Sequence, residues 1–162
     1  MKTSIKISAS LLFLFILLVV GCSKKETETT KNPLSDKHLN TKPIKHQGSP
    51  DKLVVYYFHT NYRCNTCNKF ESLTKDVLEQ DFKNFGETGK IEYKLINIEN
   101  EPNKHYVDEY KIVTKSLILS LEKKKIELQW KNLDKIWELV SDDDRFKNYI
   151  HKEIKMFLNQ VS

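Results

Sequence analysis

The feature that most constrains the fold is an alternation, from Asp51 onward, between short apolar runs and longer segments with helical spacing. The run KLVVYYFHT is rich in β-branched and aromatic residues, which predicts a buried strand at about 53–58. After it, apolar residues recur three and four positions apart among charged ones. This pattern predicts an amphipathic helix over about 64–85, ended by Gly86 and Gly89.

The alternation continues to the end of the chain. KIEYKLINIEN predicts a second strand, Pro102 suits the first turn of a short helix, and SLILSLE and IELQW predict two strands joined by a hairpin. From Asn132 the spacing is helical again, and the acidic run 142–144 suits a helix start, where carboxylates are favoured. The order strand, helix, strand, helix, strand, strand, helix predicts an α/β fold with one antiparallel pair, and residues 51–162 can bury one core.

The first residues predict export. MKTSIK is basic, and the apolar run LLFLFILLVV that follows is too short for a membrane-spanning helix, which needs about 20 apolar residues. The sequence Val19-Val20-Gly21-Cys22 resembles the lipobox of bacterial lipoproteins. That resemblance implies a signal peptide over residues 1–21, cleavage before Cys22 and a lipid on its sulfur, which would place the protein in the cell envelope, anchored outside the cytoplasm.

The segment that follows is polar. Residues 22–50 contain three prolines and few apolar residues, so beyond the lipidated Cys22 they predict a disordered tether. Without Lys2 and Lys6 of the leader, 25 basic residues face 22 acidic ones, a net charge of +3. This small excess is spread along the chain and predicts no nucleic-acid partner.

Two thiols remain if Cys22 is consumed by lipidation. Cys64 and Cys67 lie in the stretch HTNYRCNTCNKF, in a chain bound for a compartment where disulfides persist. A strand leading into Cys-x-x-Cys at a helix start, followed by this order of elements, resembles the thioredoxin fold over residues 51–162. The resemblance implies a three-layer α/β/α domain with a central mixed sheet. We expect a monomeric domain without a cofactor that exchanges disulfides with exported protein thiols or disulfides.

The predicted roles of the two cysteines differ. A thiolate at a helix start is stabilised by unpaired N–H groups and the helix dipole, which can lower its pKa from about 8.5 to roughly 3.5–7.5. Arg63 adds a nearby positive charge. Cys64 is therefore the predicted nucleophile, and Cys67, one turn later, is the predicted resolving and more buried thiol.

The chain departs from the thioredoxin pattern at two positions. The family has a cis-proline before its third core strand, where this chain has Ser116, so we expect a trans bond there. The family's reducing members also bury an acid in the strand before the motif, at a position that corresponds to Phe58. His59 is the nearest titratable residue.

Three functions fit these observations. The first is a membrane-tethered thiol–disulfide oxidoreductase that uses Cys64 and Cys67. The second is a redox-inactive binding protein that keeps the fold, which the two departures favour. The third is a copper- or zinc-binding module in which His59 joins the two cysteines, although a closed zinc site takes four ligands.

Overall fold

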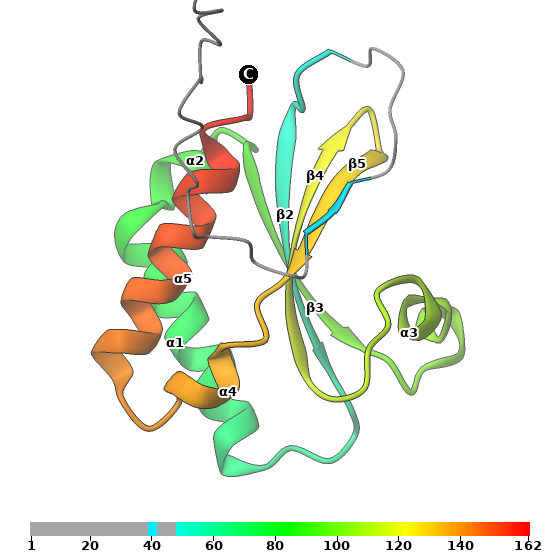
Figure 1. Cartoon of the computed structure of the whole chain (residues 1–162), viewed down its shortest axis with the longest axis vertical. Coiled ribbons are helices and arrows are strands. Elements are labelled where there is room, and N and C mark those ends of the chain that lie inside the picture. The colour runs from blue at the N-terminus through cyan, green and yellow to red at the C-terminus, as the bar shows by residue number, and fades with distance from the viewer. Residues whose placement is uncertain (1–38, 42–47) are drawn as a thin grey trace, which may run out of the picture. The chain divides into compact units, whose positions relative to one another are not determined.

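The computed structural model describes residues 39–41 and 48–162, which form a mixed five-stranded sheet flanked by helices (Figure 1). The strand order is β1-β5-β4-β2-β3. The elements in chain order are β1 (Leu39–Thr41), β2 (Lys52–His59), α1 (Asn65–Asp81), α2 (Lys83–Glu87), β3 (Ile91–Asn97), the 3-10 helix η1 (Glu101–Asn103), α3 (His105–Glu109), β4 (Ser116–Lys123), β5 (Ile126–Asn132), α4 (Ile136–Leu139) and α5 (Asp143–Leu158).

The sheet combines parallel and antiparallel pairs. β2 runs parallel to β3, with α1 and α2 in the crossover between them, and antiparallel to β4. β4 and β5 form the predicted antiparallel hairpin. The β2–β4 pair is antiparallel as well, so the single antiparallel pair expected from the order of elements was too few. This strand order and these connections confirm the thioredoxin-like α/β fold that the sequence indicated.

Strand β2 is buried on both faces, which explains its continuous apolar run. Its odd-numbered residues from Leu53 to Tyr57 pack in the larger core, together with side chains of α1 and α5. Its even-numbered residues from Val54 to Phe58 pack on the opposite face with Tyr110, which follows α3. The sheet therefore lies between two helical layers, and the short α3 makes the second layer much the thinner of the two (Figure 1).

Helices α1 and α5 lie side by side on the first face and share an aromatic contact (Figure 1). Phe70 of α1 stacks on Phe146 of α5, with ring centroids 5.6 Å apart. The acidic run begins α5 as predicted, because the Asp142 side chain accepts a hydrogen bond from the Arg145 backbone N–H at 3.0 Å. No helix in the described part of the chain has the length and apolar character needed to cross a membrane.

The predicted helix over 64–85 is two helices. α1 ends at Asp81, and Phe82 adopts φ −126° and ψ 14°, outside helical geometry, before α2 begins. The Phe82 ring is buried against His151 of α5, at 5.1 Å between ring centroids. Burial of this ring against α5 accompanies the change of direction. Gly89, with φ of 75°, then provides the left-handed turn after α2.

The sequence predicted no strand before Leu53, yet Leu39–Thr41 form β1 within the segment predicted to be a tether. β1 pairs antiparallel with β5, with Leu39 opposite Lys131 and Thr41 opposite Gln129. Such pairing uses backbone groups of an otherwise open edge strand, so it needs no apolar pattern in the sequence. The predicted signal peptide and Cys22 lie outside the described residues.

Candidate active site

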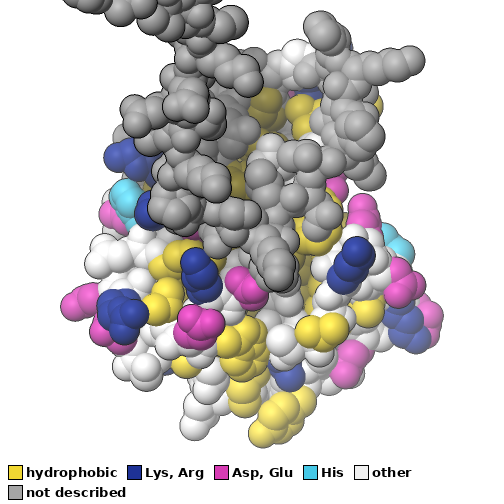
Figure 2. All heavy atoms as spheres, viewed as in Figure 1, with side chains coloured by type: hydrophobic (Ala, Val, Ile, Leu, Met, Phe, Trp, Pro, Cys, Tyr) yellow, Lys and Arg dark blue, Asp and Glu magenta, His cyan; other side chains and the backbone are white. Residues whose placement is uncertain are grey.

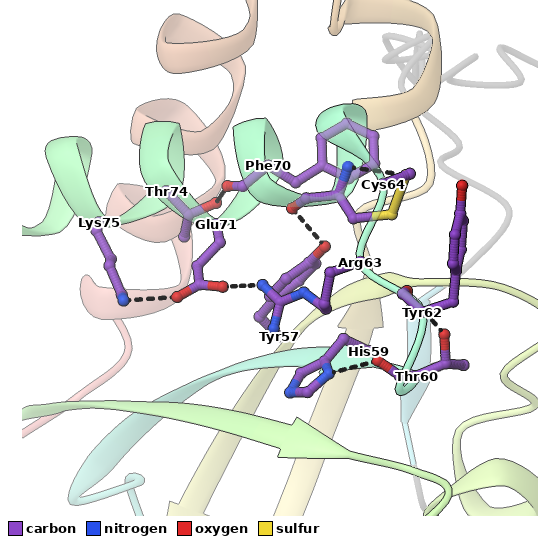
Figure 3. A network of polar contacts seen from close by, with 11 residues as sticks. Tyr57, His59, Thr60, Tyr62, Arg63, Cys64, Phe70, Glu71, Thr74 and Lys75 are labelled. Atoms are coloured by element: carbon purple, nitrogen blue, oxygen red, sulfur yellow. Dashed lines mark hydrogen bonds and ion pairs between the residues drawn. A yellow bond between two sulfur atoms is a disulfide. The ribbon is translucent and has the colours of Figure 1, made fainter.

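Cys64 lies at the junction between β2 and α1. β2 ends at His59, residues 60–63 form a short loop, and Cys64 is the N-cap residue of α1. Its Sγ accepts a hydrogen bond from the Cys67 backbone N–H at 3.1 Å (Figure 3). The sulfur therefore occupies the place where a helix start presents free N–H groups to a negative charge.

Cys64 and Cys67 form a disulfide, with their Cα atoms 5.0 Å apart. The two cysteine residues differ in exposure, because Cys64 is half-buried while Cys67 has an exposed fraction of 0%. The expectation that Cys67 is the more buried cysteine is confirmed. A reactant in solution can approach this bond only from the Cys64 side.

Arg63 forms an ion pair with Glu71 of α1, and Glu71 also accepts a hydrogen bond from Lys75 at 2.6 Å (Figure 3). Burial opposes ionisation of Glu71, but the bonds from Lys75 and Arg63 outweigh it and lower the pKa of the carboxyl. Glu71 therefore offsets much of the Arg63 charge, which the sequence analysis predicted to act on the Cys64 thiolate. An effect of Arg63 on the thiolate stays a prediction.

Tyr57, rather than Phe58, lies beneath the motif. The Tyr57 hydroxyl donates a hydrogen bond to the Cys67 carbonyl at 2.8 Å (Figure 3). Burial raises the pKa of Tyr57 to about 12, against the opposing effect of the nearby Arg63 charge. Phe58, to which the sequence analysis assigned the position of the family's buried acid, packs on the other face of the sheet. Alternation along β2 makes Tyr57 the residue on the same face as α1.

His59 is the last residue of β2. Its Nδ1 lies 2.9 Å from the Thr60 carbonyl oxygen, and its ring centroid lies 6.3 Å from that of Tyr57. Within the described ranges, no group of three or more His, Cys, Asp or Glu side chains is arranged to hold a metal ion. The structure therefore does not join His59 to the two cysteines as a ligand set.

Ser116 begins β4 directly opposite Phe58, near the C-terminal end of β2. The loop before Ser116 therefore lies at the same end of the strands as the motif. The peptide bond before Ser116 is trans, as expected, and the Ser116 hydroxyl donates to the Thr114 carbonyl at 2.9 Å. This loop contacts the motif loop, since the Lys115 ammonium lies 5.8 Å from the Tyr62 ring centroid.

The motif loop is also tied to β3 on its other side. The Asn61 backbone N–H donates to Glu99 at 2.7 Å, and the Asn97 amide donates to the Asn61 side-chain oxygen at 2.7 Å. These bonds hold residues 60–63 against the end of β3. The sequence analysis missed Asn61, Asn97, Glu99 and Glu71. Only Glu71 could have been found from spacing, because it lies one helical turn after Cys67.

No protein-family model and no curated protein matches the chain. Among solved structures, the chain is similar to the germline-specific thioredoxin Deadhead of Drosophila melanogaster, with 17% identity, 63% of this chain and 81% of that chain covered, and a TM-score of 0.40. It is also similar to chloroplastic thioredoxin z, with 15% identity, 59% and 80% coverage, and a TM-score of 0.35. A thioredoxin from Thermus thermophilus shows 10% identity, 59% and 76% coverage, and a TM-score of 0.33. The fold assignment rests on the strand order and connections described above.

Proposed function

We propose that the chain is a thiol–disulfide oxidoreductase, tethered to a membrane through a lipid on Cys22, that acts on exported protein thiols and disulfides. The observation that carries the proposal is the asymmetric disulfide. The half-buried Cys64 caps α1 and is bonded to Cys67, which is fully buried. Such an arrangement directs attack to one sulfur and leaves the other as an internal partner.

In the oxidised protein, a partner thiolate attacks Cys64 Sγ. The Cys64–Cys67 bond breaks, Cys67 leaves as a thiolate with the bonding electron pair, and a mixed disulfide joins the partner to Cys64. A second partner thiolate then attacks the partner sulfur and releases Cys64 as a thiolate at the start of α1. The partner loses two electrons and the cysteine pair gains them.

In the reduced protein, the same steps run in reverse. The Cys64 thiolate attacks a partner disulfide, and one partner sulfur leaves as a thiolate. Cys67, once deprotonated, attacks Cys64 Sγ in the mixed disulfide, restores the internal bond and releases the second partner sulfur. The reduction potentials of the protein and its partner decide which direction is favoured.

The surface around the motif supports a polypeptide partner. Three large apolar side chains on segments that border the motif are exposed: Tyr62 at 73%, Val113 at 95% and Trp137 at 38%. Figure 2 shows hydrophobic side chains at the surface of the lower half of the molecule, the end that carries α4 and the start of α1 in Figure 1. Exposed apolar side chains beside a reactive site suit contact with a partner protein.

The proposed location comes from the leader. The lipobox-like sequence before Cys22 supports lipidation, and the lipoproteins that it resembles carry several acyl chains on that cysteine, which makes a stable anchor. A site in the cell envelope suits the chemistry, because partner disulfides persist outside the cytoplasm.

The test is covalent trapping of partners in cells that express the full chain. Cys67→Ser is expected to accumulate mixed disulfides, because the attacking thiol remains and the resolving thiol is absent. Cys64→Ser is expected to trap far less although it removes the same number of sulfurs, and the double serine variant serves as the blank. Equal trapping by both single variants would contradict the assigned roles. Trapping by neither would favour the redox-inactive binding protein.

A further inference from the structure

A second surface feature adjoins the motif loop on the side of β3. An open groove of about 620 Å³ lies between the end of β3 and α3. Its lining residues are Thr60, Ile98, Glu99, Lys104, Val107 and Asp108. The apolar side chains Tyr62, Val113 and Trp137 are not among them, so the groove is distinct from that surface.

The lining combines aliphatic and acidic side chains. Ile98 and Val107 supply the aliphatic part and are half-buried, whereas Glu99 and Asp108 are exposed. Neither carboxylate forms an ion pair within the described part of the chain, and Glu99 accepts only the Asn61 N–H bond. The Lys104 ammonium is paired with Glu101 at 2.5 Å. The groove therefore presents two uncompensated carboxylates above an aliphatic wall.

This chemistry fits one kind of side chain. Arginine and lysine carry an aliphatic stem that packs on apolar surface and a cationic head that stays at the water-exposed end. In this groove the stem would pack on Ile98 and Val107, and the head would meet Glu99 and Asp108. A carboxylate or a purely aliphatic side chain would leave both groove carboxylates without a partner.

The position of the groove sets its distance from the reactive sulfur. Thr60 lines the groove and precedes Cys64 by four positions, a separation that an extended chain spans in about 14 Å at most. The hydrogen bonds from Asn61 and Asn97 hold the intervening loop against the end of β3. A partner segment in extended conformation advances about 3.3 Å per residue, so roughly four residues bridge the two places.

We propose that this groove is a specificity site which favours partner segments carrying arginine or lysine within about four residues of the reactive cysteine. Glu99 and Asp108 are the residues that determine this specificity. The inference rests on the proposed function, because it concerns which partners reach Cys64.

The test uses the full chain with Cys67→Ser and peptides whose single cysteine is activated as a mixed disulfide with thionitrobenzoate. The Cys64 thiolate attacks the peptide sulfur, the peptide becomes bonded to Cys64, and coloured thionitrobenzoate leaves with the electron pair. Peptides differ only in having arginine or glutamine at one position near the cysteine. Each rate is divided by the rate of the same peptide with free glutathione, which removes the effect of arginine on the peptide itself.

At low salt, the arginine peptide is expected to react about three- to tenfold faster than the glutamine peptide, as two partly exposed ion pairs would give. Glu99→Gln with Asp108→Asn should bring this ratio close to one, while Glu99→Gln still offers an oxygen to the Asn61 N–H. Added salt should reduce the ratio as well. The matched control, Glu79→Gln with Glu87→Gln, removes the same charge from helices outside the groove and should leave the ratio unchanged.

The outcomes separate this inference from the proposed function. Release of thionitrobenzoate without an arginine preference, or a preference that survives Glu99→Gln with Asp108→Asn, would overturn the specificity site alone. No release with any peptide would overturn the proposed function and the specificity site with it.

Discussion

Tyr57 and Tyr93 provide a matched pair for testing the hydrogen bond beneath the motif. Both face the larger core from neighbouring strands, β2 and β3. The Tyr57 hydroxyl donates to the Cys67 carbonyl at 2.8 Å, whereas the Tyr93 hydroxyl is buried with no partner among the described residues. Replacing each by phenylalanine removes one hydroxyl and leaves the ring. Tyr57→Phe should therefore lower the free energy of unfolding, whereas Tyr93→Phe should not.

The size of each effect follows from what the lost hydroxyl leaves behind. Cys67 lies within α1, and its carbonyl points along the helix toward the N–H four residues on, so it keeps an acceptor role. Tyr57→Phe should therefore cost only the net value of one hydrogen bond, about 0.5–1.5 kcal/mol. Tyr93→Phe removes an unsatisfied buried group, so stability should be unchanged or rise by up to about 2 kcal/mol.

The assay is urea-induced unfolding of the oxidised chain, followed by circular dichroism, with the slope and midpoint fitted together. A change of midpoint at constant slope reports stability alone. The midpoint of Tyr57→Phe should lie below that of the parent, and that of Tyr93→Phe at or above it. A Tyr93→Phe variant as destabilised as Tyr57→Phe would refute the reasoning, because loss of packing rather than hydrogen bonding would then explain both.

Three further predictions concern pH, a buried ion pair and the anchor. The folded-state pKa of Tyr57 is raised to about 12 from an ordinary value of about 10. The contribution of neutral Tyr57 to stability should therefore be complete below pH 10 and lost as the pH rises through about 12. Melting temperatures that stay constant between about pH 10 and 12 would contradict this prediction. Lys131 and Glu153 form a buried ion pair at 3.0 Å. Lys131→Met should therefore lower the free energy of unfolding in urea by about 3–5 kcal/mol, and Lys131→Met with Glu153→Met should lower it much less. Equal losses in the two variants would argue against a charge effect. Cys22→Ala should give only the uncleaved precursor on a gel, with no mature lipoprotein in the detergent phase. Normally processed, soluble protein from this variant would reject lipidation.

The regular elements were predictable because their signals are local. The run before His59 gives β2, and the Cys-x-x-Cys pair at a change from strand to helical spacing gives the start of α1. Asp142 could be placed at a helix start because a carboxylate acts there on its own neighbours. The strand order then follows from the few ways in which such elements connect.

The details that the sequence did not predict depend on contacts between distant segments. The break at Phe82 coincides with packing on α5, which the helical spacing of α1 cannot reveal. The choice between Tyr57 and Phe58 depends on how many residues separate the end of β2 from the motif, because one residue reverses the face. Glu71 becomes the partner of Arg63 only once the loop has turned onto α1.

If Cys22 carries the proposed lipid, the pairing of β1 with β5 limits how far the disulfide can lie from the membrane. A tether that ran free to Asp51 would extend at most about 100 Å, but one that is fixed at Leu39 leaves roughly 17 residues and at most about 60 Å. A domain anchored in this way would reach only partners close to the bilayer surface. Loss of the β1–β5 pairing would extend that reach without altering the two cysteines.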